Sequence, residues 1–223
     1  MTVKEAIKAR HSVRQFKDIP IEAETADRLR SLIEECNKES GLNIQLILDD
    51  PECFDTFLSH YGKFRCAKNY IALVGSSSLE KLDELAGYYG ERIVLEAQML
   101  GLNSCWVAGT YGKGKCKADK EKNDRIVCVI ALGYGESEGA PHKSKPLGKL
   151  CALKKEDMPV WFKNGMLAAV LAPTALNQQK FFIDIDGEEA VITSKRGPMT
   201  GIDVGIVRYN FEAASGHKCR TER

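Results

Sequence analysis

The stretch Tyr70-Ile71-Ala72-Leu73-Val74-Gly75 is the strongest strand signal in the chain. It is apolar at every position, which is typical of a strand buried on both faces of a sheet. Two other strand patterns flank it at 44–48 and 126–132, the latter ending at a glycine-rich turn. Helical periodicity gives one apolar face over 26–33, before the first of these patterns, and another over 89–101, between the last two. The first 150 residues therefore predict a sheet with helices packed against it.

The remaining residues repeat the same order of elements. A helix is predicted over 160–171, a strand over 180–184, and a hairpin at Asp186-Gly187 with its return strand at 190–192. A long helical face follows over 202–213. Because helix, strand and central helix occur twice, we expect one domain over 1–223 with duplicated halves at about 1–150 and 151–215 and a tail at 216–223.

Composition limits the class of protein. The 223 residues are 43% hydrophobic and 28% charged, with a net charge of +1, which is ordinary for a globular protein and argues against a dedicated nucleic-acid binder. The longest apolar candidate, 166–176, is too short to span a membrane and contains a proline, and no apolar signal segment opens the chain. We therefore expect a cytoplasmic protein with neither nucleic-acid nor membrane partners.

The eight cysteines are scattered and form no CxxC pair, so the sequence gives little support to a metal site. Most are expected to be reduced thiols, several of them buried. The run Gly112-Lys113-Gly114-Lys115-Cys116 lacks the Gly-Lys-Ser/Thr of a Walker phosphate loop and is interpreted as a lid or turn.

A second informative stretch follows a short helical pattern at the start of the chain: Arg10-His11-Ser12-Val13-Arg14. If this stretch is extended, Arg10, Ser12 and Arg14 share one face while His11 and Val13 take the other. Two guanidinium groups and a hydroxyl on one face suit phosphate oxygens. The alternative is a solvated basic turn, and spacing alone does not decide between the two.

Three stretches together resemble the FMN-dependent nitroreductase family, in particular its shorter branch found in thermophilic and anaerobic bacteria. They are Arg-His-Ser-Val-Arg-Gln-Phe at 10–16, Gly-Leu-Asn-Ser-Cys-Trp at 101–106 and Ala-Pro-Thr-Ala-Leu-Asn-Gln-Gln at 172–179. The resemblance implies an α+β fold, with a central antiparallel or mixed sheet flanked by helices. It also fits two pseudo-repeated halves that resemble a dimer within one chain.

The resemblance assigns Arg10, His11, Ser12 and Arg14 to the phosphate, ribityl chain and ring of FMN. Lys143 and Lys145 stand where a basic pair commonly reaches the phosphate, although a solvated loop is the open alternative. Val107, Ala108 and Gly109 take the place where the family brings a backbone N–H towards flavin N5, and small residues suit such a close approach. The alternative there is that Cys105 and Trp106 simply fill the core.

A departure from the family pattern concerns its proline-containing motif, which normally follows the first helix and contacts flavin from the opposite subunit. Here 36–43 lacks the proline, and the motif occurs instead in the second half. Its members are Pro173, Thr174, Ala175, Asn177 and Gln179. The expectation is one flavin site completed by both halves, no second equivalent site, and either a monomeric pseudo-dimer or a homodimer.

The implied activity is a ping-pong transfer from NAD(P)H through FMN to a nitroaromatic, quinone or similar small acceptor. Flavin carries this chemistry, so no side-chain acid or base is strictly required, and we assign no catalytic residue. The alternative is a non-catalytic flavin-binding or regulatory protein on the same scaffold.

Overall fold

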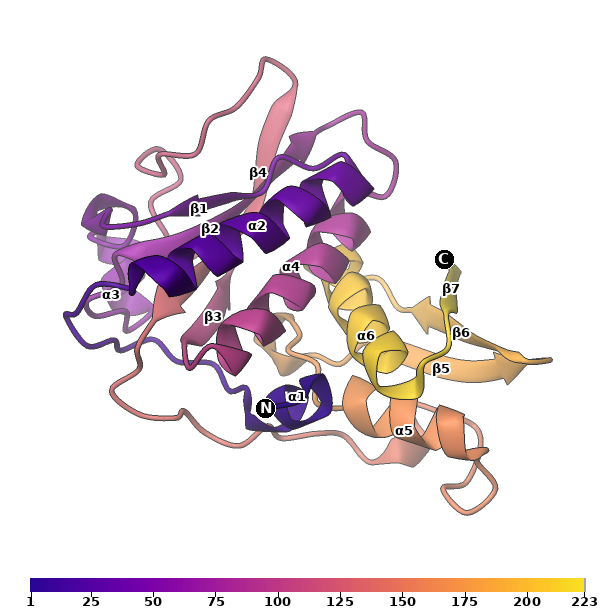
Figure 1. The fold of residues 1–223 in the computed structure, drawn as a ribbon. Coiled ribbons are helices and arrows are strands. Elements are labelled where there is room, and N and C mark those ends of the chain that lie inside the picture. Colours follow the sequence, from indigo (N-terminus) through magenta and orange to yellow (C-terminus); the bar gives the residue numbers. More distant parts are fainter. Residues whose placement is uncertain (223) are drawn as a thin grey trace. The chain divides into compact units, whose positions relative to one another are not determined.

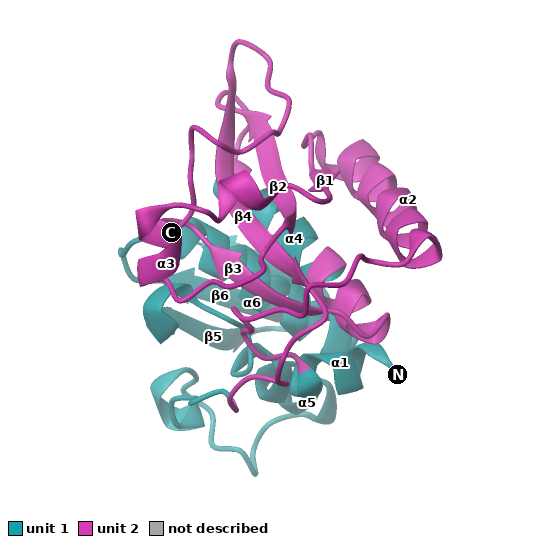
Figure 2. Cartoon of the chain, turned by 90° about the vertical axis from the view of Figure 1, so that its left-hand side faces the viewer, with its two compact units in different colours: residues 1–9, 83–92, 142–223 teal, residues 10–82, 93–141 magenta. Residues whose placement is uncertain are grey.

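The computed structural model describes residues 1–222, which divide into two compact units (Figure 2). Unit 1 contains residues 1–9, 83–92 and 142–223, of which 223 lies outside the described residues, and unit 2 contains residues 10–82 and 93–141. These boundaries differ from the expected halves at about 1–150 and 151–215. The single domain and its internal duplication stay predictions.

Unit 2 is built on a four-stranded antiparallel sheet (Figure 1). Its strands are β1 (Gln45–Ile47), β2 (Asn69–Ser76), β3 (Asn103–Val107) and β4 (Asp124–Gly133), in the order β1-β2-β4-β3. The first seven residues of β2 are buried, which confirms the prediction from its unbroken apolar run. β3 was not predicted as a strand, and it pairs with β4 from Asn103 opposite Gly133 to Val107 opposite Val129.

The helices of unit 2 begin with α2 (Ala23–Ser40), which runs alongside β1 in Figure 1. It ends at Gly41, whose φ of 73° is the left-handed conformation that glycine adopts readily. Asn37 ties the helix end to the strand, because its side chain accepts from Ile44 N over 2.7 Å and donates to Ile44 O over 2.9 Å. Two short helical turns that were not predicted follow, at Pro51–Cys53 and at α3 (Phe57–Tyr61).

One face of the unit 2 sheet carries a hydrophobic core cluster. Alternate residues of the strands supply it, and it also includes Val13 and Phe16 from the N-terminal stretch. The strand members are Tyr70, Ala72, Val74, Cys105, Val107, Val129 and Ala131. The same cluster takes in Phe54 and Phe64 from the segment between β1 and β2. This packing holds the stretch that begins at Arg10 against the sheet.

Unit 1 combines helices with a smaller mixed sheet. Its helices are α1 (Val3–Ala9), the first part of α4 (Leu82–Met99), α5 (Val160–Ala169) and α6 (Thr200–Ser215). β5 (Phe181–Asp186) and β6 (Glu189–Ser194) form the predicted hairpin, and β7 (Cys219–Glu222) adds to β6 in parallel. The segment expected as a tail thus contains a strand, which its polar sequence did not indicate.

Within unit 1, α4 and α6 cross with their backbones in close contact. A Cβ atom on Gly87 would lie 2.1 Å from the carbonyl oxygen of Ile202, and one on Gly205 would lie 2.0 Å from that of Glu84. Arg208 Nη1 pairs with Glu84 Oε1 at 3.2 Å beside this crossing. α4 begins at Leu82, seven residues before the predicted helix at 89–101.

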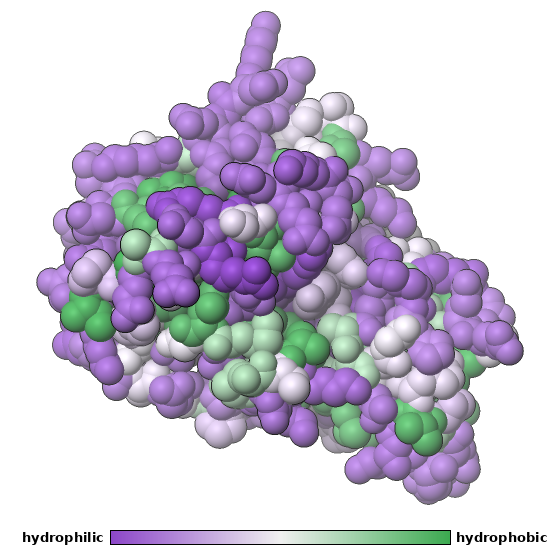
Figure 3. All heavy atoms as spheres, in the orientation of Figure 1, coloured by the Kyte–Doolittle hydropathy of each residue, from purple (hydrophilic) through white to green (hydrophobic). Residues whose placement is uncertain are grey.

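The two sheets and their helices confirm the α+β class, with one antiparallel and one mixed sheet. Across residues 1–222, no helix is long and apolar enough to cross a membrane. In the view of Figure 3 hydrophilic residues cover most of the surface and hydrophobic residues form smaller patches, as is usual for protein surfaces.

Candidate functional site

The stretch from Arg10 to Phe16 is extended and bonded to unit 2. Ser12 forms a parallel bridge with Ser104 at the start of β3, and Val13 N donates to Ser104 O over 3.0 Å. Further along, Arg65 N donates to Arg14 O over 3.0 Å and Phe16 N donates to Arg65 O over 3.1 Å. Val13 and Phe16 are buried at 3% and 1% exposure. These contacts fix which side chains face the core and which face away from it.

Arg10, Ser12 and Arg14 all act on the thiol of Cys105 in β3. Burial raises the pKa of this thiol, whereas the guanidinium charges of Arg14 and Arg10 and a hydrogen bond with Ser12 oppose the rise. The charges of Arg10 and Arg14 are thus felt at the Cys105 thiol, which lies in the core cluster together with Val13. Arg10 is only 3% exposed, which a freely solvated basic turn would not explain.

His11 faces a different segment, the loop after β4. Its Nδ1 lies 3.1 Å from the carbonyl oxygen of Glu138, and a Cβ on Gly139 would lie 2.8 Å from the His11 Cβ. Asn103 fixes this loop, because its Oδ1 accepts from Gly135 N over 2.9 Å and its Nδ2 donates to Glu138 Oε2 over 3.3 Å. Sequence reasoning missed Asn103, although a buried polar residue at the start of an apolar strand is a usable signal.

Val107, Ala108 and Gly109 lie at and just beyond the end of β3. Cys105 and Val107 are buried in the core cluster, whereas Trp106 is half-buried and is not one of its members, so the core interpretation fits Cys105 better than Trp106. Ala108 is half-buried and Gly109 is exposed. The expected role of this backbone towards a flavin ring stays a prediction.

In unit 1, the structure brings Lys143, Lys145, Asn177 and Gln179 into one hydrogen-bond network. Gln179 is 3% exposed, accepts from Lys145 N over 2.7 Å and donates to Lys143 O over 3.0 Å. Asn177 Nδ2 donates to the same Lys143 oxygen over 2.9 Å. Lys145 Nζ donates to Gln178 O over 2.7 Å and to Gln179 O over 3.0 Å. The Lys145 side chain is thus engaged with the 173–179 loop.

This loop has an unusual backbone. Leu176, Asn177 and Gln179 have φ values of 52°, 52° and 43°, in the left-handed region that residues with a Cβ rarely adopt. Pro173 is buried, and Gln179 N donates to Thr174 Oγ1 over 3.1 Å, whereas the Leu176 side chain is 92% exposed. Backbone strain of this kind persists only where the surroundings hold it, and it is often found at functional sites.

Asp203 on α6 is a further anchor of the loop. Its Oδ1 accepts from Ala175 N over 2.8 Å and its Oδ2 from Gln178 Nε2 over 2.7 Å. The residue is 4% exposed, and burial raises the pKa of its carboxyl group to about 6. The sequence signal was an aspartate beside Ile202 in an apolar helical pattern, and sequence reasoning did not use it.

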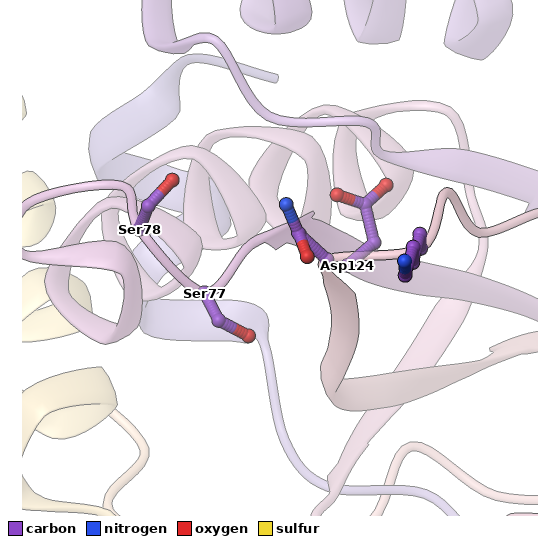
Figure 4. Close-up of a pocket in the computed structure, with 5 residues that line it drawn as sticks. Ser77, Ser78 and Asp124 are labelled. Carbon is purple, nitrogen blue, oxygen red and sulfur yellow. The ribbon is translucent and has the colours of Figure 1, made fainter.

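A recess lies at the far end of the unit 2 sheet, where β2 ends and β4 begins. It is lined by Ser77, Ser78, Lys122, Asn123 and Asp124. Figure 4 shows that Ser77, Ser78 and Asp124 point in different directions. None of the predicted site residues lines it. Among residues 1–222, no group of three or more histidine, cysteine, aspartate or glutamate side chains is placed to hold a metal ion.

The chain matches a known protein family. The family model described as "Putative TM nitroreductase" matches residues 2–215, nearly the whole sequence. The chain belongs to this nitroreductase family. A search of curated proteins found no match.

Solved structures share the fold of this nitroreductase-family chain. A "putative nitroreductase" from Thermotoga maritima is 23% identical, with a TM-score of 0.70 over 96% of this chain and 83% of that one. A "putative nitroreductase in complex with FMN" from Desulfovibrio desulfuricans is 22% identical, with a TM-score of 0.52 over 70% and 98%. An FMN-dependent nitroreductase from Clostridium difficile is 19% identical, with a TM-score of 0.51 over 69% and 96%.

The predicted site residues of this nitroreductase-family chain thus form two sets. In unit 2, Arg10, Ser12 and Arg14 lie along the extended stretch beside β3, and His11 Nδ1 lies 3.1 Å from the carbonyl oxygen of Glu138. Unit 1 gathers the two lysines and the proline-containing loop in a separate network. Each set has a defined geometry of its own.

Proposed function

We propose that this chain is an FMN-dependent oxidoreductase that accepts reducing equivalents from NAD(P)H and passes them to a nitroaromatic, quinone or similar small acceptor. The observation that carries the proposal is the burial of Arg10 at the start of an extended stretch that bridges to β3 at Ser104, in a chain that belongs to a nitroreductase family. Relatives of the same fold are described as FMN-dependent or as bound to FMN.

The donors in unit 2 fit the phosphate end of FMN. Two guanidinium groups offset the charge of a phosphate, and each presents paired N–H donors that match its oxygens, while the Ser12 hydroxyl adds a third donor. Arg10 is only 3% exposed, so the surrounding residues hold its side chain in place before a ligand binds. When bound, FMN supplies the hydride-transfer chemistry. His11 is proposed as a further contact beside the phosphate donors.

Other contacts are proposed from the remaining residues. Val107, Ala108 and Gly109 offer backbone N–H groups where a planar ring can approach small side chains. In unit 1, the proposed contacts come from a loop whose shape is fixed by hydrogen bonds and by Asp203. They are Lys143, Lys145, Pro173, Thr174, Ala175, Asn177 and Gln179.

No side chain is assigned to proton transfer, and the proton for the acceptor is proposed to come from water. The chain is proposed to act as a monomeric pseudo-dimer or as a homodimer. Light scattering on the purified protein distinguishes these two states.

Anaerobic absorbance titration tests the activity. The purified protein should be yellow, NADH or NADPH should bleach it within seconds, and a nitroaromatic or quinone should restore the colour. A yellow protein that neither nicotinamide bleaches would instead indicate a non-catalytic flavin-binding protein. A colourless protein that does not take up added FMN would contradict both functions.

A further inference from the structure

Unit 2 contains a pair of cysteines that the proposed flavin chemistry does not use. Cys53 lies in the turn Pro51–Cys53 and is fully buried, and Cys116 follows the turn at 112–115 and is partly exposed. Each of the two thiols shifts the pKa of the other, so the two side chains are near one another. Both residues are free thiols, 63 positions apart in the sequence.

Backbone hydrogen bonds bring the two cysteine segments together. Gly112 N donates to Cys53 O over 2.8 Å, and Cys116 N donates back to Gly112 O over 3.1 Å, so Gly112 links one cysteine to the other. The glycine- and lysine-rich run at 112–116 is therefore a tight turn that seats Cys116 beside Cys53. The same core cluster contains Cys53, and Cys116 packs against it.

Polar contacts around the pair reinforce this arrangement. The Tyr70 hydroxyl donates to Asp50 Oδ2 over 2.6 Å and accepts from Lys117 N over 3.0 Å. Lys117 Nζ also pairs with Asp50 Oδ1 at 3.1 Å, and Lys115 Nζ pairs with Glu52 Oε2 at 3.4 Å. Residues close to Cys53 in the sequence thus form ion pairs with residues next to Cys116.

The surroundings of the two sulfurs differ. The Cys53 S–H and the backbone N–H of Ala118 donate to the Cys116 sulfur and lower its pKa, although burial opposes this. Cys53 keeps its proton, because donation to Cys116 and burial raise its pKa. Cys116 is the more exposed of the two, so a small oxidant reaches its sulfur first, and Cys53 is its buried neighbour.

We propose that Cys116 and Cys53 form a peroxide-sensitive dithiol that closes reversibly to a disulfide. The Cys116 thiolate attacks one oxygen of a hydroperoxide, forming an S–O bond and breaking the O–O bond. Cys116 becomes a sulfenic acid, and the peroxide is reduced to an alcohol, or to water when it is hydrogen peroxide, taking a proton from solvent. The Cys53 sulfur then attacks the Cys116 sulfur, an S–S bond forms, and the hydroxide leaves as water with the Cys53 proton.

Peptide mapping of the full chain tests this modification. The protein is reduced, freed of reductant and treated with one equivalent of hydrogen peroxide, and its peptides are analysed by mass spectrometry without reduction. The expected result is a linked pair of peptides containing Cys53 and Cys116, which dithiothreitol separates. Recovery of both cysteines as free thiols while the exposed Cys66 is oxidised would overturn the proposal.

Three variants assign the roles of the two sulfurs. Cys53→Ala should leave Cys116 as a sulfenic acid that dimedone traps, and Cys116→Ser should abolish the linked peptide. Cys66→Ser is the matched control, because Cys66 is exposed and lies outside the pair. This variant should give the same yield of the linked Cys53–Cys116 peptides as the unaltered chain. Circular dichroism checks that Cys53→Ala is folded. If this variant does not fold, peptide mapping of the unaltered chain is the deciding test. Absence of the linked peptide from that sample would contradict the proposed disulfide.

Discussion

The backbone N–H of Ala175 donates to Oδ1 of Asp203 over 2.8 Å, which fixes the proline-containing loop to α6 through a buried carboxylate. Gln178 Nε2 occupies the other carboxylate oxygen at 2.7 Å. A loop with three non-glycine residues at positive φ needs such an anchor.

Stability should depend on the ionisation of Asp203. Burial raises the pKa of Asp203 in the folded state to about 6, whereas in the unfolded state it is about 3.9. Between about pH 3.9 and about pH 6 the folded state therefore holds a proton that the unfolded state has released. The carboxyl's contribution to stability is therefore full at low pH and falls as the pH rises from about 4 to about 6, by roughly 2–3 kcal/mol. Asp203→Asn should remove this slope in urea unfolding measured across that range. If the unfolding free energy changed between pH 4 and pH 6 by the same amount in Asp203→Asn as in the unaltered chain, the raised pKa of Asp203 would be contradicted.

Loss of the guanidinium groups in unit 2 should release FMN. Arg10→Ala with Arg14→Ala removes charge-assisted hydrogen bonds worth about 1.5–3 kcal/mol each, so affinity should fall roughly 10²- to 10⁴-fold. Flavin retained on purification, read from visible absorbance, measures the loss. Arg14→Ala alone keeps the buried Arg10 and should give an intermediate loss. The matched control is Arg28→Ala with Arg30→Ala, exposed arginines of α2, which should keep full flavin.

Asn177→Ala should weaken FMN binding if the proline-containing loop contributes to the site. The substitution removes a donor to Lys143 O and an acceptor for Gln179 Nε2, and one hydrogen bond is worth about 1 kcal/mol, or about fivefold in affinity. Leu176→Ala is the control, because Leu176 has the same positive φ but its side chain is exposed. Equal affinity in the two variants would count against the contribution of Asn177.

The backbone crossing of α4 and α6 in unit 1 should not tolerate a side chain at Gly205. A Cβ there would lie 2.0 Å from Glu84 O and 2.6 Å from Tyr88 N, so the helices must separate and lose packing. Gly205→Ala should lower the free energy of unfolding by roughly 3 kcal/mol or more, measured in urea. Gly148→Ala, with open space around its Cβ, should change it by less than about 1 kcal/mol.

Glu212 should contribute stability at neutral pH that is lost in acid. Burial favours its neutral form, but hydrogen bonds from Cys219 N, Arg208 and Lys218 keep its pKa below the ordinary value. A lowered folded pKa means that this contribution is present above the unfolded value and disappears as the pH falls through the folded one. Glu212→Gln should therefore destabilise the protein at pH 7 by roughly 1.5–3 kcal/mol, and by less in acid. The exposed Glu34→Gln serves as the control.

Several features of the fold followed from local patterns. The apolar run of β2 and the hairpin between β5 and β6 each depend on residues adjacent in the sequence. The stretch from Arg10 to Phe16 is extended, and the shared face of Arg10, Ser12 and Arg14 stays a prediction. The three motifs carried the family resemblance, which the family match over residues 2–215 confirms.

Other features depend on partners far away in the sequence. β7 is a strand only because β6 provides its hydrogen-bonding partner, since its own sequence has no strand pattern. Asp203 is a loop anchor because α6 brings it to Ala175, 28 positions earlier, and Cys116 meets Cys53 because Gly112 bonds to the Cys53 carbonyl. Periodicity within the sequence therefore determined which residues face inward, whereas tertiary packing decided which buried polar groups meet, because their partners come from other segments of the chain.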